Sequence, residues 1–227
     1  MSTTEVEQGI RYTPPNVRSW RDEGRFLIPG VSYRGNRIDC LLFEEMTPPM
    51  SQDNLIEFYE REKQAGNPLP TDAPLIWAIA TRAYELRDEN SEEGGRLQSF
   101  FRKDIRRYPN TLTRIHYSPG DDSILHNVGT SEEYTSKGRV VGPDNWVDNI
   151  PDKDILERVL GTQDVEQINA VSQHINGTNA YIRRLNSKPK QLDKRVARFS
   201  AYDDRLVLGC GRGALGGYPA FRVLKIE

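Results

Sequence analysis

The chain has 227 residues, enough for one large domain or two small ones, and 28% of them are charged although the formal net charge is only −2. This balance excludes a uniformly polybasic protein, so any contact with nucleic acid must depend on local charge asymmetry. The periodic apolar segments exclude a disordered chain. Because there is no membrane-length apolar run and the N-terminus is polar and acidic, we expect a cytoplasmic protein without a membrane partner.

The first 45 residues predict an arm followed by a β-hairpin. Residues 1–25 are polar and contain Pro14-Pro15, which favours an extended arm. In residues 25–45 two apolar runs flank a turn at Arg34-Gly35-Asn36, a pattern typical of two antiparallel strands.

A helical block follows this hairpin. Ser51 and Asp72 are suitable N-caps for two helices, the first ending near Gln64 and the second carrying Pro74 in its first turn. An acidic linker over 89–95 then leads into a third predicted helix over 96–108.

The middle of the chain alternates between strand and helix signals. Residues 111–117 alternate in polarity like a half-buried strand, and 123–128 follow closely enough to pair with them. A short helix is predicted from Asp154, and Gly161 should end it.

The longest regular apolar repeat begins at Asp164. Ile168, Ile175 and Ile182 recur every seven residues, which predicts one long central helix reaching to about Leu185. From Arg195 the period changes to two, and RVARFSAY, RLVLGC and FRVLKI predict three strands of a C-terminal antiparallel sheet.

Together these segments predict an α+β protein. Its N-terminal half would be α-rich with short strands, and its long central helix would pack on the C-terminal antiparallel sheet. We expect an arm over 1–25 and a single domain over 26–227; a sub-boundary near 109–111 is the alternative.

The glycine-rich stretch near the C-terminus resembles the first motif of Rossmann-type methyltransferases. In LVLGCGRGA, residues 206–214, a strand runs into a GxG turn that would hold the cofactor. This resemblance implies a following helix and further strands, whereas only about a dozen residues remain and they have the pattern of a turn and a strand. We therefore predict a loop over 211–217 between the last two strands and no cofactor.

The two cysteines, Cys40 and Cys210, are far apart, and their spacing fits neither a disulfide framework nor a zinc site. We expect buried thiols and no metal.

Positive charge is densest over residues 183–198, and this segment carries the leading functional hypothesis. Guanidinium, ammonium and amide groups there could hold phosphates, so we expect a non-enzymatic binding or assembly protein that engages nucleic acid or another polyanion. The candidate ligand-binding residues are Arg184, Asn186, Lys188, Lys190, Arg195 and Arg198.

Two alternatives stay open. Arg114 and His116 share one face of the predicted strand, and His126 on the next strand could join them in a cleft, as an enzyme or small-ligand binder acting on a phosphate-bearing substrate requires. The chain could also be a homo-oligomer or a structural subunit of a larger assembly. The sequence does not decide whether the protein is an enzyme.

Overall fold

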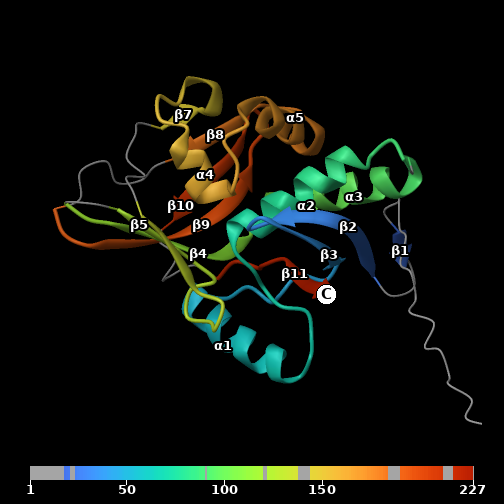
Figure 1. The fold of residues 1–227 in the computed structure, drawn as a ribbon, viewed down its shortest axis with the longest axis horizontal. Helices are drawn as coiled ribbons and strands as arrows, with labels where there is room; N and C mark the ends of the chain where they lie inside the picture. Colours follow the sequence, from blue (N-terminus) through green and yellow to red (C-terminus); the bar gives the residue numbers. More distant parts are fainter. Residues whose placement is uncertain are drawn as a thin grey trace, which may run out of the picture.

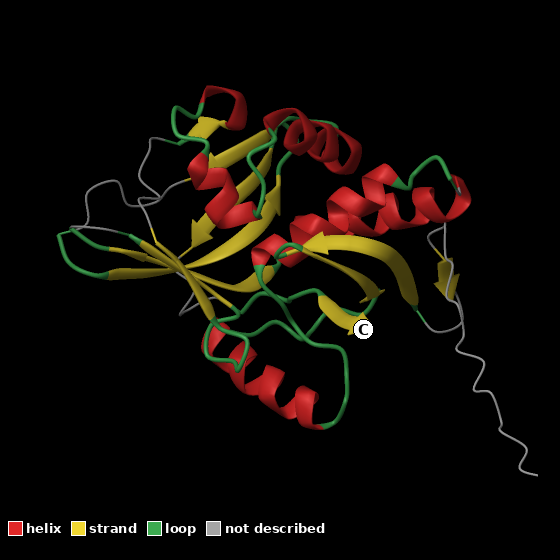
Figure 2. Cartoon of the chain, viewed as in Figure 1, coloured by secondary structure: helices red, strands yellow, loops and turns green. Residues whose placement is uncertain are grey.

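Two β-sheets and the helices packed on them make up the fold (Figures 1 and 2). The structure is a computed structural model that describes residues 18–20, 24–89, 91–119, 122–137, 144–183, 190–211 and 217–226.

The smaller sheet has four strands in the order β1-β2-β3-β11, all antiparallel to their neighbours. Its strands are β1 (Arg18–Trp20), β2 (Arg25–Tyr33), β3 (Asn36–Phe43) and β11 (Arg222–Ile226). Arg34 and Gly35 connect β2 to β3 with φ angles of 52° and 77°. A two-residue hairpin of this kind needs such positive values, which glycine adopts readily at Gly35.

The larger sheet has seven strands in the order β6-β5-β4-β9-β10-β8-β7, and among them only β8 and β10 run parallel. Its strands are β4 (Asn110–Tyr117), β5 (Ser123–His126), β6 (Tyr134–Lys137), β7 (Asn145–Trp146), β8 (Ala180–Arg183), β9 (Asp193–Ala201) and β10 (Leu206–Gly211).

The helices divide between the two faces of this larger sheet (Figure 1). They are α1 (Gln52–Gln64), α2 (Ala73–Glu85), α3 (Ser91–Asp104), α4 (Asp154–Leu160) and α5 (Val165–Asn176), with 3₁₀ turns η2 (Ile105–Arg107) and η3 (Val147–Asn149). Helix α2 contacts β2, β4, α3, α4 and α5, and its Trp77 stacks on Phe199 of β9 at 6.1 Å between ring centroids. We call this side of the seven-stranded sheet the core face.

Helix α1 lies against the opposite side, which we call the outer face. The side-chain amide of Gln52 donates hydrogen bonds to the Thr111 and Thr113 carbonyls of β4 at 2.8 and 3.1 Å. Leu55 and Tyr59 of α1 pack with Leu112 of β4 in an apolar cluster separate from the main core.

The α+β class and most of the expected elements are confirmed. Ser51 and Asp72 cap α1 and α2, accepting hydrogen bonds from the Asn54 and Leu75 amides at 3.2 and 2.9 Å. Gly161, in the left-handed conformation, ends α4 as expected. Cys40 is buried, as expected, and its burial raises the pKa of the thiol to about 12. The side chain of Cys210 is outside the described part of the chain.

The predicted long central helix is wrong beyond Asn176. Helix α5 ends there because Gly177 adopts a left-handed φ of 75° and its amide closes the last turn on the Gln173 carbonyl. Ile168 and Ile175 are buried as expected, but Ile182 reaches the same core from strand β8. The heptad spacing therefore joins two different elements.

An α-rich N-terminal half is not evident, because strands β1 to β3 and the start of β4 lie in it beside α1 to α3. Nor do the last three strands form one sheet, because β11 pairs with β3 while β9 and β10 lie in the larger sheet. The predicted acidic linker is also wrong: α3 begins at Ser91, with Glu92 and Glu93 in its first turn, where carboxylates favour the helix dipole. The arm before Arg18 and the glycine-rich residues 212–216 are outside the described ranges.

Candidate functional site

The structure does not bring Arg114, His116 and His126 into one cleft. Side chains alternate between the faces of a strand, and directly paired residues share a face. Ile115 pairs with the buried Ile124, so His126, two residues further on, also points to the core face. Arg114 and His116 point to the outer face, on the opposite side of the sheet.

His126 is a neutral structural histidine. Its Nε2 is 2.9 Å from the Arg158 carbonyl and must carry the proton, because a carbonyl only accepts. Its Nδ1 is 3.0 Å from the Thr113 hydroxyl, which accepts from the Ala73 amide and can therefore donate to Nδ1. The ring stacks on Tyr134 at 4.7 Å. Burial lowers the pKa of His126 and keeps it uncharged.

This environment predicts that stability falls as the solution is acidified. Below about pH 6.5 the unfolded chain binds a proton at His126 that the folded protein rejects, so stability present above pH 6.5 is lost as the pH falls towards the lowered folded pKa. The loss at His126 should approach about 1.4 kcal/mol per pH unit. Burial lowers the pKa of His116 and His174 as well, but these two side chains are less buried and should contribute less. Urea unfolding of the wild type and His126→Phe between pH 7.5 and 5 measures it. Equal pH slopes in the two proteins would contradict the assignment.

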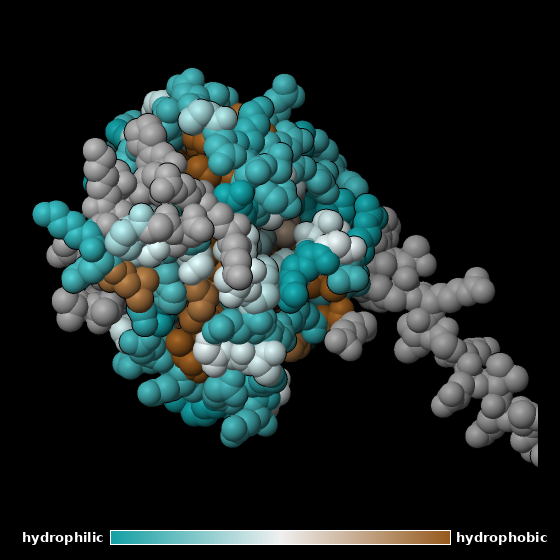
Figure 3. All heavy atoms as spheres, turned by 60° about the vertical axis from the view of Figure 1, so that its left-hand side comes forward, coloured by the Kyte–Doolittle hydropathy of each residue, from teal (hydrophilic) through white to brown (hydrophobic). Residues whose placement is uncertain are grey.

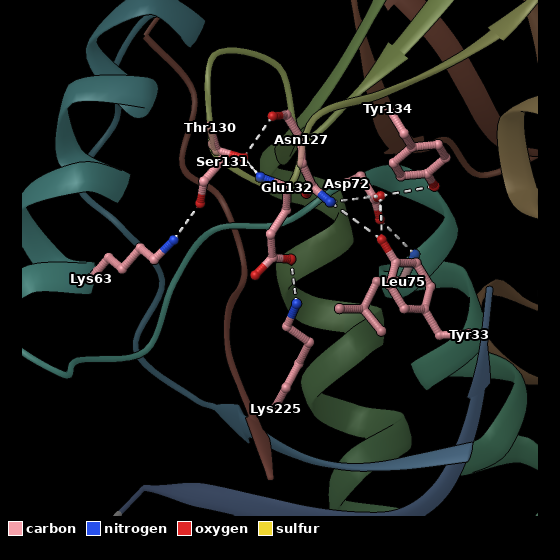
Figure 4. Close-up of polar contacts among 10 residues, drawn as sticks. All are labelled: Tyr33, Lys63, Asp72, Leu75, Asn127, Thr130, Ser131, Glu132, Tyr134 and Lys225. Atoms are coloured by element: carbon pink, nitrogen blue, oxygen red, sulfur yellow. Dashed lines mark hydrogen bonds and ion pairs between the residues drawn. The ribbon is translucent and has the colours of Figure 1, made fainter. Parts of the chain in front are cut away.

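A buried carboxylate, Asp72, joins several elements at the core (Figure 4). Its Oδ2 accepts hydrogen bonds from the Tyr33 hydroxyl at 2.6 Å, the Tyr134 hydroxyl at 3.1 Å and the Asn127 amide at 3.2 Å. Its Oδ1 caps α2 through the Leu75 amide. Burial first, and then the charge of Asp72, raise the pKa of both tyrosines, so their hydroxyls stay protonated as donors. The cluster is a structural junction.

The basic segment is divided between strands and residues outside the described ranges. Arg184, Asn186 and Lys188 belong to the second group. Arg195 points to the core face, is only 6% exposed and forms two hydrogen bonds with Asp193 at 2.6 and 2.9 Å. Its charge is therefore neutralised inside the molecule, and it does not belong to an exposed cationic surface.

The other cations of this segment gather on the outer face. Arg183 of β8 and Arg198 of β9 both pair with Gly209 of the intervening strand β10, so their backbones are about 10 Å apart. Lys194 is two alternations before Arg198 on the same face. Within the described residues, none of these three cations forms an ion pair with a carboxylate, and the same holds for the exposed Lys190.

His116 lies beside the positive charges of this face. It pairs directly with Lys194 across β4 and β9. Burial lowers the pKa of His116 first, and the charges of Lys194 and Arg114 lower it further, although Glu133 opposes them. Its Nε2 is a buried atom that has no hydrogen-bond partner among the described residues. Arg114 itself is held by Asp53 at 2.6 Å and contributes less free charge.

Tyrosines lie between these cations. The Arg198 guanidinium is 4.5 Å from the Tyr218 ring, Tyr218 contacts Tyr108 edge-on at 6.2 Å, and Tyr108 contacts Tyr202 at 5.9 Å. Tyr202 is 38% exposed. It also lines a hollow of about 260 Å³ together with Tyr181 and Arg183. We call Arg183, Lys194, Arg198, Tyr181, Tyr202 and Tyr218 the outer-face surface.

Sequence reasoning missed Tyr202 and Tyr218 because they come from separate parts of the chain, and no spacing indicates that they lie near the same cations. The side of the molecule that carries β5 is largely hydrophilic, with hydrophobic residues only in small groups (Figure 3). No helix of the described chain is both long and apolar enough to cross a membrane.

The geometry defines an α+β protein with a sheet face of cations and tyrosines. Comparison of the chain with known protein families, characterised proteins and solved structures found no match. Its function is therefore inferred from this geometry.

Proposed function

We propose that this protein binds single-stranded nucleic acid on the outer-face surface. The observation that carries the proposal is the row Arg183, Gly209 and Arg198 across three neighbouring strands, with Lys194 further along β9. Burying these arginines and lysines against phosphates would release counterions from the strand, which is the main driving force for such binding.

Tyrosine interleaving favours a single strand over a duplex. Unpaired bases can stack on partly exposed rings such as Tyr202 and Tyr218, whereas stacked base pairs in a duplex present only phosphates and groove edges. The outer-face surface is built on strands. The neighbouring helix α1 is packed on β4 through Leu55 and Tyr59.

Fluorescence anisotropy with a labelled oligonucleotide tests the proposal. Arg183→Gln/Lys194→Gln/Arg198→Gln should weaken binding of single-stranded DNA or RNA by about 10- to 100-fold, because three phosphate contacts are lost. The matched control is Arg61→Gln/Lys63→Gln/Lys103→Gln, which removes the same charge from α1 and α3. Equal losses in the two triple variants, or no binding by the wild type, would refute the assigned surface.

Tyr202→Leu separates nucleic acid from other polyanions. Removing a stacking ring should weaken oligonucleotide binding by about 1–3 kcal/mol and leave heparin binding unchanged, because heparin has no bases. Equal weakening for both ligands would exclude base stacking at Tyr202. Stronger binding of heparin than of any oligonucleotide would identify the surface as a general polyanion site.

A further inference from the structure

A cavity of about 590 Å³ opens between the β2–β3 hairpin, α2 and α4. His126, Tyr134 and Ser136 line it from the core-face side of the large sheet, so it is separate from the outer-face surface. Its volume is in the range of sites that hold small organic molecules.

Cations outnumber carboxylates around this cavity, since Arg34, Arg37, Arg82 and Arg158 line it with Glu85 and Glu157. Arg82 is committed to the Pro29 carbonyl and Glu85, at 2.9 and 3.0 Å. Arg158 is 3.5 Å from Asp154.

Arg34 and Arg37 differ from the other two arginines. Both are exposed, and in the described part of the chain neither forms an ion pair. The Arg34 guanidinium is 4.1 Å from the Tyr134 ring centroid, which directs it over the cavity wall. Two unpaired guanidinium groups at one edge favour an anion with several acceptor oxygens.

Two hydrogen-bonding groups buried behind the inner wall are not used by the described protein. Trp77 Nε1 and Thr81 Oγ1, one turn apart on α2, are buried atoms without a hydrogen-bond partner among the described residues. Both residues line the cavity, and Trp77 is only 3% exposed. Leaving a buried donor unpaired costs about 1–3 kcal/mol, so an acceptor supplied by a ligand would recover that free energy.

We propose that this cavity binds a phosphomonoester of a small polar molecule. Arg34 and Arg37 hold the phosphate at the exposed edge. An oxygen or nitrogen acceptor on the organic part receives hydrogen bonds from Trp77 Nε1 and Thr81 Oγ1. The site therefore contacts both the phosphate and the organic part of its ligand.

Isothermal titration calorimetry tests this with ribose 5-phosphate, adenosine 5′-monophosphate and uridine 5′-monophosphate as probes. At least one should bind about tenfold more tightly than its dephosphorylated form and than inorganic phosphate, since each end adds one or more charge-assisted or buried hydrogen bonds. Absence of binding by all three at millimolar concentration overturns the proposal. Binding of inorganic phosphate as tightly as every ester would also overturn it, because the organic part would then contribute nothing to the affinity.

Two variants test where the phosphomonoester binds within the cavity. Arg34→Gln/Arg37→Gln should weaken the bound phosphomonoester at least about tenfold. Thr81→Val should also weaken it while leaving the melting temperature unchanged, because the Thr81 hydroxyl has no partner in the described fold. A lowered melting temperature with unchanged affinity would show that the hydroxyl serves folding, and would overturn the inner contact.

The outer-face triple variant Arg183→Gln/Lys194→Gln/Arg198→Gln should bind the phosphomonoester as the wild type does, and Arg34→Gln/Arg37→Gln should bind oligonucleotides normally. Loss of phosphomonoester binding in the outer-face variant would show that this ligand binds the outer-face surface, and would overturn the cavity assignment. Failure of oligonucleotide binding alone would affect only the proposed function.

Discussion

Replacing Asp72 with alanine is expected to lower the free energy of unfolding by about 3–5 kcal/mol. The side chain is fully buried, and its removal leaves the Tyr33 and Tyr134 hydroxyls and the Asn127 amide without their acceptor. It also removes the N-cap of α2, the helix that contacts both sheets. Urea unfolding at neutral pH measures the loss.

Asp203→Ala is the matched control for this change. Its carboxylate is 97% exposed and bonds only Arg106, at 3.1 Å, among the described residues. Surface pairs of this kind contribute about 0–1 kcal/mol, so the control should unfold almost as the wild type does. If both alanine variants lost the same free energy, Asp72 would not be the junction that its hydrogen bonds indicate.

Adjacent glycines in α3 should respond to alanine in opposite directions. A Cβ at Gly94 would lie 2.7 Å from the Arg87 carbonyl oxygen, a backbone atom that cannot move aside as a side chain can. Gly94→Ala should therefore destabilise the protein by about 2–3 kcal/mol.

At Gly95 an added Cβ meets nothing within 4 Å, and the residue is helical. Gly95→Ala should raise stability by about 0.5–1 kcal/mol, because alanine loses less backbone entropy than glycine in a helix. Thermal unfolding of both variants checks the pair. Destabilisation by Gly95→Ala, or tolerance of Gly94→Ala, would mean that the start of α3 does not pack against Arg87 in this way.

Elements set by local chemistry were predictable from the sequence. Ser51 and Asp72 form their caps with the next turn of the chain, and the Arg34-Gly35 turn needs only positive φ angles, so neither depends on distant residues. The partner of β11 could not be predicted, because pairing with β3 joins segments about 180 residues apart and no local pattern specifies it.

The candidate site was predictable in charge but not in geometry. Once β9 is known to be a strand, period-two alternation places Lys194 and Arg198 on one face and Arg195 on the other. The separation of these cations between the two faces was therefore predictable from the sequence. The seven-residue spacing through Ile182 led to β8 being predicted as part of the helix, although Gly177 is typical of a helix end. Opposite orientations of His116 and His126 follow from the β4–β5 register, which is set by long-range pairing.

The salt dependence of wild-type oligonucleotide binding tests the central claim most directly. Each phosphate held by Arg183, Lys194 or Arg198 should contribute about −0.7 to the slope of log K against log salt concentration for a single strand. Three such contacts predict a slope of about −2, which the outer-face triple variant reduces towards zero. A slope near zero in the wild type, or one that the triple variant leaves unchanged, would contradict nucleic-acid binding by this face.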